Sequence, residues 1–499
     1  MDFLDPRKKR KHKIRLMVGY FLMSIVIGLA TVILVYGAYG YGINTKTGQI
    51  IQNGLLFVDS KPGGANIYLN GQLQSAQTAA RLVLNAGDYN LTIKKDGYRA
   101  WQRNFVLDEH TIARYVYPFL FPQKPYTLAL KTYPTQPGMV TETPDRHWLL
   151  VQSVESTQGN LSFDQYDTSA LSKPPDVVAL PKTVVTPADN STFKEVEWST
   201  NNTQLLLEHT YPGGHEFIVF NRTKPETSFN VNRLFKAEPS EVALKNKKAD
   251  QLYLFNKETG SLQLADTGQG TLDQPFLKHV LEFKPYGNNI VNYVTDVGAP
   301  AGKVTARIWD NTKTYPLYTF NAGQTYLVDT AQFQGHWYYV AGSDTSDRIN
   351  IFKDPEDSIR DPRFAKAVPL IALSQQGANK LSFSDNARFI SAQAGQDFAV
   401  YDLETDNSYH YNVKSPLAGN MHWMDGHRLM GLSGGQVFVI DYDNKNQQLV
   451  NPSLLNEGGF FSRDYNQMIV IQPNSNGAGT VLERVDLRAG ADLPKDKSQ

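Results

Sequence analysis

One segment of the chain has the spacing of a known catalytic nucleophile. Residues 431–435 read GLSGG, which fits G-x-S-x-G, the turn that presents a serine to an ester or amide carbonyl. Enzymes built on that turn place an acid and then a histidine after the serine, and no histidine follows His427. The flanking residues also predict a strand, a turn and a strand, whereas the catalytic turn joins a strand to a helix. We therefore interpret residues 431–435 as a β-hairpin turn.

Two other clusters have residue types that could bind a metal ion. His422, Asp425 and His427 fall within one turn, but HWMDGH lacks the spacing of a helical zinc motif. Residues 441–446 (DYDNKN) begin like a calcium loop, yet the central glycine and the distal glutamate are missing. We expect both segments to be ordinary turns, with the residues of the first exposed to solvent.

The remaining candidates are also accounted for by turns. His209, His215 and Glu216 flank Gly213-Gly214, a pattern typical of a hairpin. The chain has no phosphate-binding loop and no dinucleotide fingerprint, and its lack of cysteine excludes disulfides, thiolate metal sites and cysteine nucleophiles. The sequence therefore predicts no catalytic residue, no cofactor or cofactor-binding residue and no metal ligand.

The elements that position these residues are strands of a loose repeat. From about residue 138, an apolar strand ending in an aromatic residue is followed by a polar turn and a second apolar strand. Aligning the second strands gives spacings of about 38–57 residues, in the range of propeller blades. We predict a mainly β chain with an eight-bladed β-propeller; seven blades is the alternative, because one unit is irregular. The aligned positions are Leu149, Leu206, Tyr253 (the irregular unit), Val291, Tyr338, Ile390, Met430 and Ile469.

The last repeat supplies only three strands, ending at residues 481–487 (VLERVDL). TLALK, residues 127–131, precedes the first repeat and could be the missing outer strand, because an open ring would expose a sheet edge. The two-residue period of a strand then places Leu128 and Leu130 on one face, packed near Val481, Leu482 or Val485.

Short motifs connect both halves of this β-rich region to known families. The turns FSDN, WMDG and FSRD resemble the blade turn of TolB-type propellers, which are similar to Trp-Asp-repeat propellers without their signature dipeptide. Residues 60–71 (SKPGGANIYLNG), residues 84–93 (LNAGDYNLTI) and Gly97-Tyr98 closely resemble the PEGA domain, although Gly63 stands where the family motif has glutamate. The resemblance implies a non-catalytic element of the bacterial envelope. Independently, Asn70-Gly71 predicts a two-residue hairpin with positive φ.

The N-terminal part has the pattern of a membrane anchor. Leu16 to Tyr39 contains no charged residue, and a helix of this length could cross the roughly 30 Å hydrocarbon core of a bilayer. Residues 7–15 hold eight basic residues in nine, which favours a cytoplasmic location for this end. Tyr36, Tyr39 and Tyr41 would form an outer aromatic belt. We predict a single-pass signal-anchor that binds the lipid bilayer and leaves the rest extracytoplasmic; a cleaved signal peptide is the alternative.

Composition and order complete the predicted organisation. Lys plus Arg and Asp plus Glu both number 49 among the 499 residues, so no basic surface for nucleic acid is implied. The predicted order is a basic cytoplasmic tail (1–15), a transmembrane helix (16–39), a spacer (40–53), a small antiparallel PEGA-like β-sandwich (54–108), a Pro- and aromatic-rich connector (109–125), the propeller (126–488) and a polar tail (489–499).

Two functional hypotheses follow from this organisation. The first is a non-catalytic, membrane-tethered scaffold whose propeller binds a protein or envelope-glycan partner, since radially stacked sheets present many loops around a channel mouth. The second is an envelope-acting hydrolase or lyase whose site is assembled from several blades. A channel pocket that holds two or more convergent carboxylates or histidines would favour the enzyme.

Overall fold

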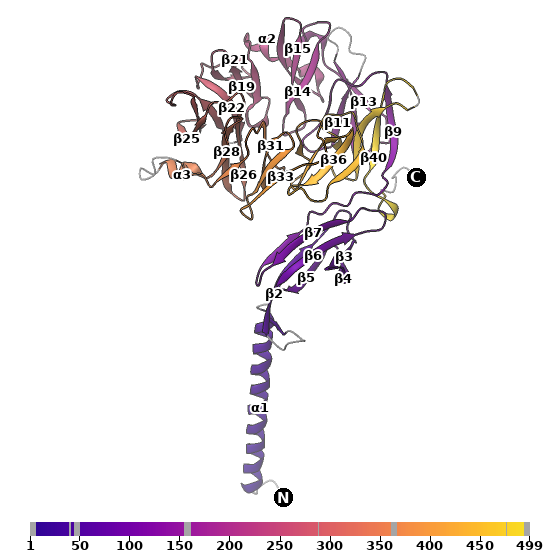
Figure 1. The fold of residues 1–499 in the computed structure, drawn as a ribbon, viewed down its shortest axis with the longest axis vertical. Helices are drawn as coiled ribbons and strands as arrows, with labels where there is room; N and C mark the ends of the chain where they lie inside the picture. Colours follow the sequence, from indigo (N-terminus) through magenta and orange to yellow (C-terminus); the bar gives the residue numbers. More distant parts are fainter. Residues whose placement is uncertain are drawn as a thin grey trace. The chain divides into compact units, whose positions relative to one another are not determined.

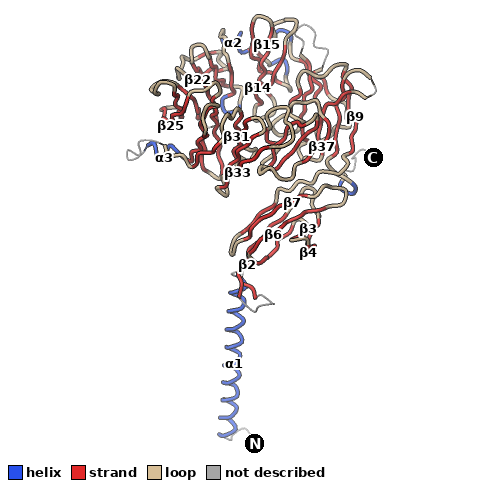
Figure 2. Tube along the Cα trace, viewed as in Figure 1, coloured by secondary structure: helices blue, strands red, loops and turns tan. Residues whose placement is uncertain are grey.

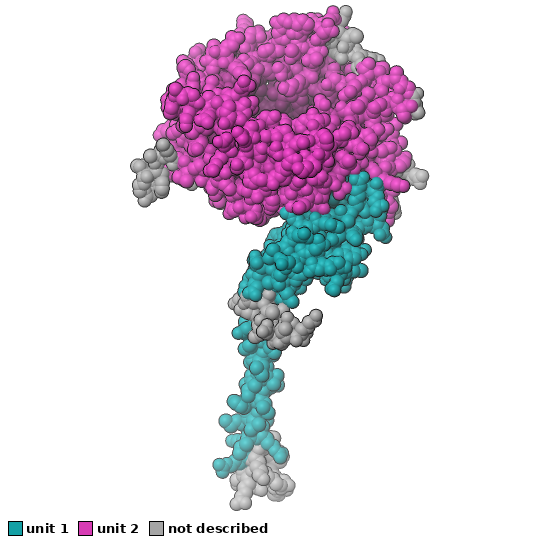
Figure 3. Space-filling model, in the orientation of Figure 1, with its two compact units in different colours: residues 1–123 teal, residues 124–499 magenta. Residues whose placement is uncertain are grey.

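The computed structural model describes residues 6–38, 41–43, 50–153, 161–287, 289–360, 367–475 and 477–493. Within these ranges the fold is mainly β, with one long N-terminal helix and ten four-stranded sheets (Figure 1). Strands dominate both parts of the chain outside the long helix (Figure 2). The chain divides into two compact units, residues 1–123 and residues 124–499, each of which is described by itself (Figure 3).

The helix α1 (Pro6–Ala38) contains the described part of the predicted span. Proline is well suited to the first turn, where an amide hydrogen would have no partner. Lys13–Tyr36 has a mean hydropathy of 2.5 and is not buried, so by length and composition it is a candidate membrane span or signal sequence. The helix also includes most of the basic run; Tyr39 lies outside the described residues.

The rest of the first unit consists of two sheets. The first contains β1 (Tyr41–Ile43), β2 (Ile50–Val58), β5 (Ala80–Asn85) and β8 (Ile112–Tyr115), and the second, in spatial order, β4 (Gln72–Gln77), β3 (Asn66–Leu69), β6 (Gly87–Lys94) and β7 (Trp101–Leu107). The core takes apolar side chains from both sheets, among them Leu56, Val58, Ile67, Leu91 and Trp101, each 2% exposed or less. Alternate residues of each strand therefore build one small β-sandwich.

This sandwich is larger than the predicted range of 54–108. The expected spacer, 40–53, contributes β1 and the start of β2, which pair. The expected connector, 109–125, contributes β8, which pairs parallel with β2, so the sandwich is not purely antiparallel. Its prolines exclude a helix, but their neighbours still donate backbone hydrogen bonds, such as Leu120 N to Lys61 O at 2.8 Å. The segment is therefore part of the domain.

The predicted hairpin at Asn70-Gly71 is confirmed. Leu69 pairs with Gln72 across the turn, and the two central residues have φ angles of +49° and +80°. The side chain of Asn70 also accepts a hydrogen bond from Asn90 N at 2.7 Å, which ties the turn to β6. Glycine is favoured at the second position because its φ is positive.

The second unit contains, within its described residues, eight four-stranded antiparallel sheets arranged as a β-propeller around a central opening (Figure 3). In chain order they comprise β10 (Val140–Glu142), β11 (Trp148–Gln152), β12 (Ser162–Asp167) and β13 (Asp176–Ala179); β14 (Thr192–Trp198), β15 (Gln204–Tyr211), β16 (Gly214–Asn221) and β17 (Phe229–Asn230); β18 (Glu241–Leu244), β19 (Gln251–Asn256), β20 (Ser261–Asp266) and β21 (Thr271–Leu272); and β22 (Val280–Tyr286), β23 (Ile290–Thr295), β24 (Lys303–Trp309) and β25 (Thr314–Asn321). They continue with β26 (Tyr326–Phe333), β27 (His336–Ser343), β28 (Arg348–Lys353) and β29 (Ile371–Ser374); β30 (Lys380–Phe383), β31 (Phe389–Ala394), β32 (Asp397–Asp402) and β33 (Asn407–Asn412); β34 (His422–Trp423), β35 (Arg428–Ser433), β36 (Gln436–Asp441) and β37 (Gln448–Pro452); and β38 (Phe460–Phe461), β39 (Gln467–Pro473), β40 (Thr480–Asp486) and β9 (Tyr126–Tyr133). Two short helices, α2 (Val231–Phe235) and α3 (Pro355–Arg360), accompany them.

The predicted repeat alignment is confirmed. Each of the eight aligned residues falls on the second strand of a different sheet, and each is at most 3% exposed. Apolar clusters join neighbouring sheets; one of them combines Leu206 of β15 with Leu252 and Leu254 of β19. The same strand position therefore builds the core between sheets around the ring.

The predicted closing strand is also confirmed, with one correction. β9 pairs antiparallel with β40, and a core cluster joins Leu149 and Val151 of the first sheet to Ile471 of the last. The register shifts at Leu130, so the expected shared face is wrong: Leu130 packs against the cluster, whereas Leu128 is 36% exposed. A β-bulge inserts one extra residue into a strand, so residues two apart across the bulge no longer point to the same face.

Candidate functional site

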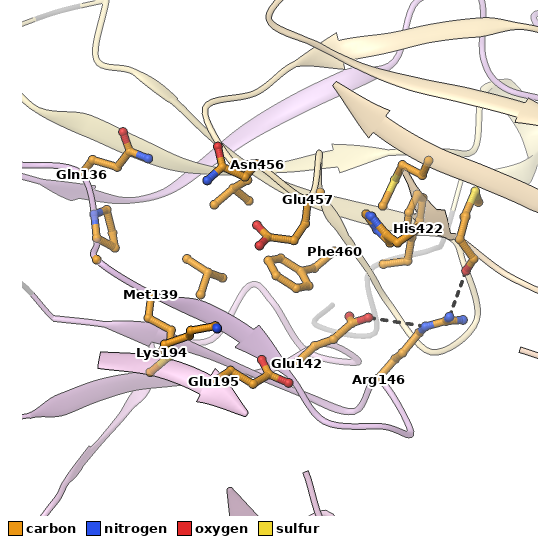
Figure 4. Close-up of a pocket in the computed structure, with 18 of the residues that line it drawn as sticks. Gln136, Met139, Glu142, Arg146, Lys194, Glu195, His422, Asn456, Glu457 and Phe460 are labelled. Carbon is orange, nitrogen blue, oxygen red and sulfur yellow. Dashed lines mark hydrogen bonds and ion pairs between the residues drawn. The ribbon is translucent and has the colours of Figure 1, made fainter. Parts of the chain in front are cut away.

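A pocket of about 550 Å³ lies where the first strands of four sheets come together (Figure 4). Its lining comes mainly from β10, β14, β34 and β38 and from the segments next to them, together with Met430 of β35. These strands belong to the first two and the last two sheets in chain order. The pairing of β9 with β40 and the core cluster beside it join the two ends of the ring, so closure assembles the pocket.

Three carboxylates line this pocket. Glu142 ends β10, Glu195 lies on β14, and Glu457 precedes β38 (Figure 4). Burial raises the pKa of Glu142 to about 8, and the charge of Glu195 adds to this effect, while Arg146 and a backbone hydrogen bond from Phe461 oppose it. Burial also raises the pKa of Glu195, with a further contribution from Glu457. The three groups therefore interact, and each disfavours the ionisation of its neighbour.

Arg146 holds the turn after β10 against three other sheets. Its Nη2 donates to Asp385 Oδ2 at 2.8 Å and to the carbonyl oxygen of Met424 at 2.9 Å. Its guanidinium lies 4.6 Å from the centre of the Tyr465 ring, and its Nε is 3.5 Å from Glu142 Oε1. Because Asp385 takes the closer ion pair, Arg146 neutralises Glu142 only in part.

One oxygen of the pocket has no hydrogen-bond donor. Glu142 Oε2 is buried and finds no partner among the residues that the structure describes. A buried carboxylate oxygen without a donor is costly, so such atoms in native proteins need an explanation, for example a ligand. Glu142 itself lines the pocket, so its carboxyl group lies at the wall of the cavity.

His422 and Lys194 complete the ionisable groups of the lining. Burial lowers the pKa of His422 to about 4, and the charges of Lys380 and Arg146 lower it further. His422 is therefore neutral at neutral pH and adds no positive charge to the pocket. Lys194 is exposed.

The interpretation of residues 431–435 as a hairpin is confirmed. β35 ends at Ser433, which pairs with Gln436, and Gly434 and Gly435 have φ angles of +57° and +73°. Ser433 is 6% exposed and no helix follows it. The segment therefore lacks the backbone of a catalytic serine turn.

The cluster around Asp425 is a turn, but the expectation that it is exposed to solvent is wrong. Asp425 Oδ1 accepts from His427 N at 2.8 Å, and the carboxylate pairs with Arg428. The His427 ring packs against Phe389, with ring centres 5.5 Å apart, and burial lowers its pKa to about 4. His422 lies apart from this turn, in the pocket wall.

The other two segments are turns, as predicted. In residues 441–446, Asn446 Nδ2 donates to Asp441 Oδ2 at 2.8 Å. His209 and Glu216 lie opposite each other on the hairpin β15–β16, with His209 Nδ1 2.9 Å from Glu216 Oε1. Within the described residues, no group of three or more His, Cys, Asp or Glu side chains could hold a metal ion.

The sequence patterns described above do not single out the pocket residues Glu142, Arg146, Glu195 and Glu457. The available signal was an ionisable residue within a first apolar strand, as at Glu142 in VTETPD and at Glu195 in KEVEW. A buried glutamate in such a strand is unusual unless it is paired or functional. That signal does not show which strands meet, because closure of the ring decides it.

Comparison with known proteins identifies the small N-terminal domain. Residues 53–116 match the family model of the PEGA domain, and none of the curated proteins matches the chain. The chain is similar to the structure of an oligogalacturonate lyase in complex with manganese (10% identity, 73% of this chain and 98% of that chain, TM-score 0.38). It is also similar to an uncharacterized protein from Listeria monocytogenes EGD-e (12%, 67% and 93%, TM-score 0.39) and to a eukaryotic initiation factor (11%, 73% and 94%, TM-score 0.42).

At these values the structural likenesses carry no functional argument. The chain combines a PEGA domain with a β-propeller.

Proposed function

We propose that this chain is a membrane-anchored, non-catalytic binding protein whose central pocket holds a cationic group of a protein or envelope-glycan partner. The observation that carries the proposal is Glu142 Oε2, a buried acceptor without a donor beside two further carboxylates. A bound ammonium or guanidinium group would supply both the missing donor and the opposite charge. We take each four-stranded sheet of the ring as one blade, eight in all.

If the pocket binds a cation, the affinity should depend on pH. At neutral pH, Glu142 retains its proton because its pKa is raised to about 8. A cation favours the ionised carboxylate, so binding should release a proton and strengthen as the pH rises from about 6 to about 8. The side chains of lysine and arginine stay cationic throughout this range, whereas the amino group of an amino sugar loses its proton within it, so the strengthening is expected for a lysine or arginine partner.

Isothermal titration calorimetry of the full chain in lipid nanodiscs tests this function. The two probes are a lysine tripeptide and a glucosamine trimer, which distinguish a protein source from a glycan source. Glu457→Gln should weaken the binding of the preferred probe about ten-fold, since hydrogen bonds to charged groups contribute roughly 1.5–3 kcal/mol. Glu258→Gln, an exposed residue outside the pocket, is the matched control. Equal affinity in both variants would contradict the proposal, as would no binding of either probe.

A second function is favoured by one specific observation. The pocket holds three carboxylates and His422, and a carboxyl with a pKa of about 8 could act as a general acid in a hydrolase or lyase. Glycoside hydrolysis also needs a second carboxylate held at a fixed separation. Among the described residues, none donates a hydrogen bond to Glu457 that would fix its position, so we favour binding. Release of soluble fragments from envelope glycan by the wild type, lost in Glu142→Gln, would support the enzyme instead.

The proposed anchor is Leu16 to Tyr39, with the N-terminus in the cytoplasm and both domains outside. The apolar helix and the basic run before it support this topology. Protease added to intact spheroplasts should then digest the propeller and leave a short membrane-bound fragment. Full protection of the propeller, or recovery of a chain cleaved after the apolar segment, would contradict it.

A further inference from the structure

One face of the PEGA sandwich exposes apolar and basic side chains in two rows. Leu55 of β2 lies between Val83 of β5 and Ile112 of β8, and these two neighbours are 58% and 52% exposed. The next row places Phe57 between Arg81 and Arg114, both of which are exposed. The inward side chains of the same strands, such as Leu56, form the core, so this is the outer face of the sheet.

The charge of this face is positive. The Arg114 guanidinium lies 5.5 Å from the centre of the Phe57 ring, so the cation and the aromatic ring are presented together. Directly after β2 comes Asp59, whose Oδ1 accepts from Ser60 N at 2.7 Å. Val116, 57% exposed, follows β8 and extends the apolar surface. We call these residues (Leu55, Phe57, Arg81, Val83, Ile112, Arg114 and Val116) the outer face of the first sheet.

We propose that the outer face of the first sheet docks on the anionic lipid headgroups of the membrane that holds the chain. Interfacial membrane binding combines exposed aromatic and aliphatic side chains with basic residues that pair with anionic headgroups, which is the composition of this face. The inference rests on the membrane anchor of the proposed function. It goes beyond that anchor, because it places a specific surface of the PEGA domain on the bilayer.

Because α1 would hold the PEGA domain close to the membrane, a weak contact between this face and the lipid headgroups would be enough for docking. Only residues 39 and 40 separate α1 from β1, a strand of this same sheet, so the chain between them can reach at most about 10 Å. Two arginines and a few apolar side chains would bind a membrane weakly if the domain were free. On a tether of this length the effective concentration is in the range of about 1 mM, so the contact becomes intramolecular.

A second copy of the chain fits this face less well. In a two-fold dimer the same patch occurs on both partners, so Arg81 and Arg114 of one copy would meet a surface of the same sign. Among the described residues, the strands of this sheet carry no carboxylate, and Asp59 follows β2 directly. Anionic headgroups instead offer opposite charge to both guanidiniums.

Site-directed fluorescence on the full chain tests the inference, because the protein has no cysteine of its own. Val83→Cys on the outer face of the first sheet and Val106→Cys on the second sheet give a matched pair, 58% and 65% exposed. Each variant carries an NBD label and is reconstituted into vesicles of phosphatidylcholine, with or without phosphatidylglycerol and with a headgroup-level quencher. We expect strong quenching at position 83 in anionic vesicles and little at position 106.

Charge variants sharpen the test. Arg114→Gln should reduce the docked fraction relative to the undocked fraction about five-fold, the factor that one basic residue near an anionic surface contributes. Lys94→Gln, on the second sheet, should leave it unchanged. Equal quenching at positions 83 and 106 in floating vesicles would overturn the docking and leave the anchor intact. Failure of the chain to float with vesicles would overturn both, and quenching at position 83 that ignores lipid charge and rises with protein density would assign the face to a second copy.

Discussion

The first and second strands of the propeller sheets differ in chemical character. The second strands carry a buried apolar residue at every aligned position, from Leu149 to Ile469. The first strands carry ionisable residues instead, on seven of the eight sheets among the described residues: Glu142, Glu195, Glu241, Glu282, Asp329, Lys380 and His422. The second strands therefore supply the apolar core between the sheets, and the first strands supply the ionisable side chains at the centre of the ring.

The physical reason is the environment of each strand. Second strands such as β35 are buried at every residue, because neighbouring sheets cover both faces. First strands lie at the centre and keep access to water; β30 has no buried residue. In the first strands, partial burial disfavours the ionised form of a carboxyl group. Burial raises the pKa of Glu282 to about 7, with a further contribution from the charge of Glu241.

The largest loss of stability should come from a substitution in β9, the strand that closes the propeller. Tyr133 on β9 is 2% exposed, and its Oη donates to the buried Asp164 at 2.7 Å. Tyr133→Ala should lower the free energy of unfolding by about 3–5 kcal/mol, through the cavity and the lost donor. Tyr126→Ala, on the same strand but 58% exposed, should change it by about 0.5 kcal/mol or less. Urea unfolding of both variants measures the difference, and equal midpoints would mean that β9 does not hold the ring closed.

The sequence could predict the ring but not its centre. Leu206 and its equivalents recur with a period, and the missing fourth strand pointed to TLALK, so local pattern and the avoidance of a sheet edge were enough. The pocket needs Glu195 and Glu457 side by side, which closure decides. The shift at Leu130 is also tertiary, since Lys131 and Tyr133 both bond Asp164 of the first sheet. Such contacts leave no periodic signal in the chain.

The next effect concerns the pH dependence of stability. The native pKa of Glu142 is about 8, above the unfolded value near 4.5. Between these values the native state binds the proton and the unfolded state does not, so Glu142 destabilises the fold progressively as the pH rises from about 5 to about 8. Glu142→Gln should therefore be more stable than wild type at pH 8 by roughly 2–4 kcal/mol, and nearly equal to it at pH 5. Urea midpoints across this range measure the gap; a gap that stays constant with pH would contradict the buried acid.

The smallest predicted change in stability concerns a hairpin of the PEGA domain, which lies outside the propeller. Gly71 has a φ of +80° and open space around its position for a side chain, so Gly71→Val should cost only backbone strain, about 1–2 kcal/mol. Gly63→Val, in a turn without positive φ, is the control. Hydrogen exchange of residues 66–77 in the full chain should show faster opening for the first variant alone. Unchanged exchange would contradict the hairpin.

The most direct test of the different roles of first and second strands compares two residues of one sheet. Glu195 lies on the first strand β14, and Leu206, 0% exposed, on the second strand β15. We predict that Glu195→Gln weakens binding of the preferred amine probe about ten-fold with no loss of stability. Leu206→Ala should lower the free energy of unfolding by about 2–5 kcal/mol and leave the affinity of the folded protein unchanged. If each variant lost both affinity and stability, or if Glu195→Gln bound as well as wild type, the first strands would not hold the site.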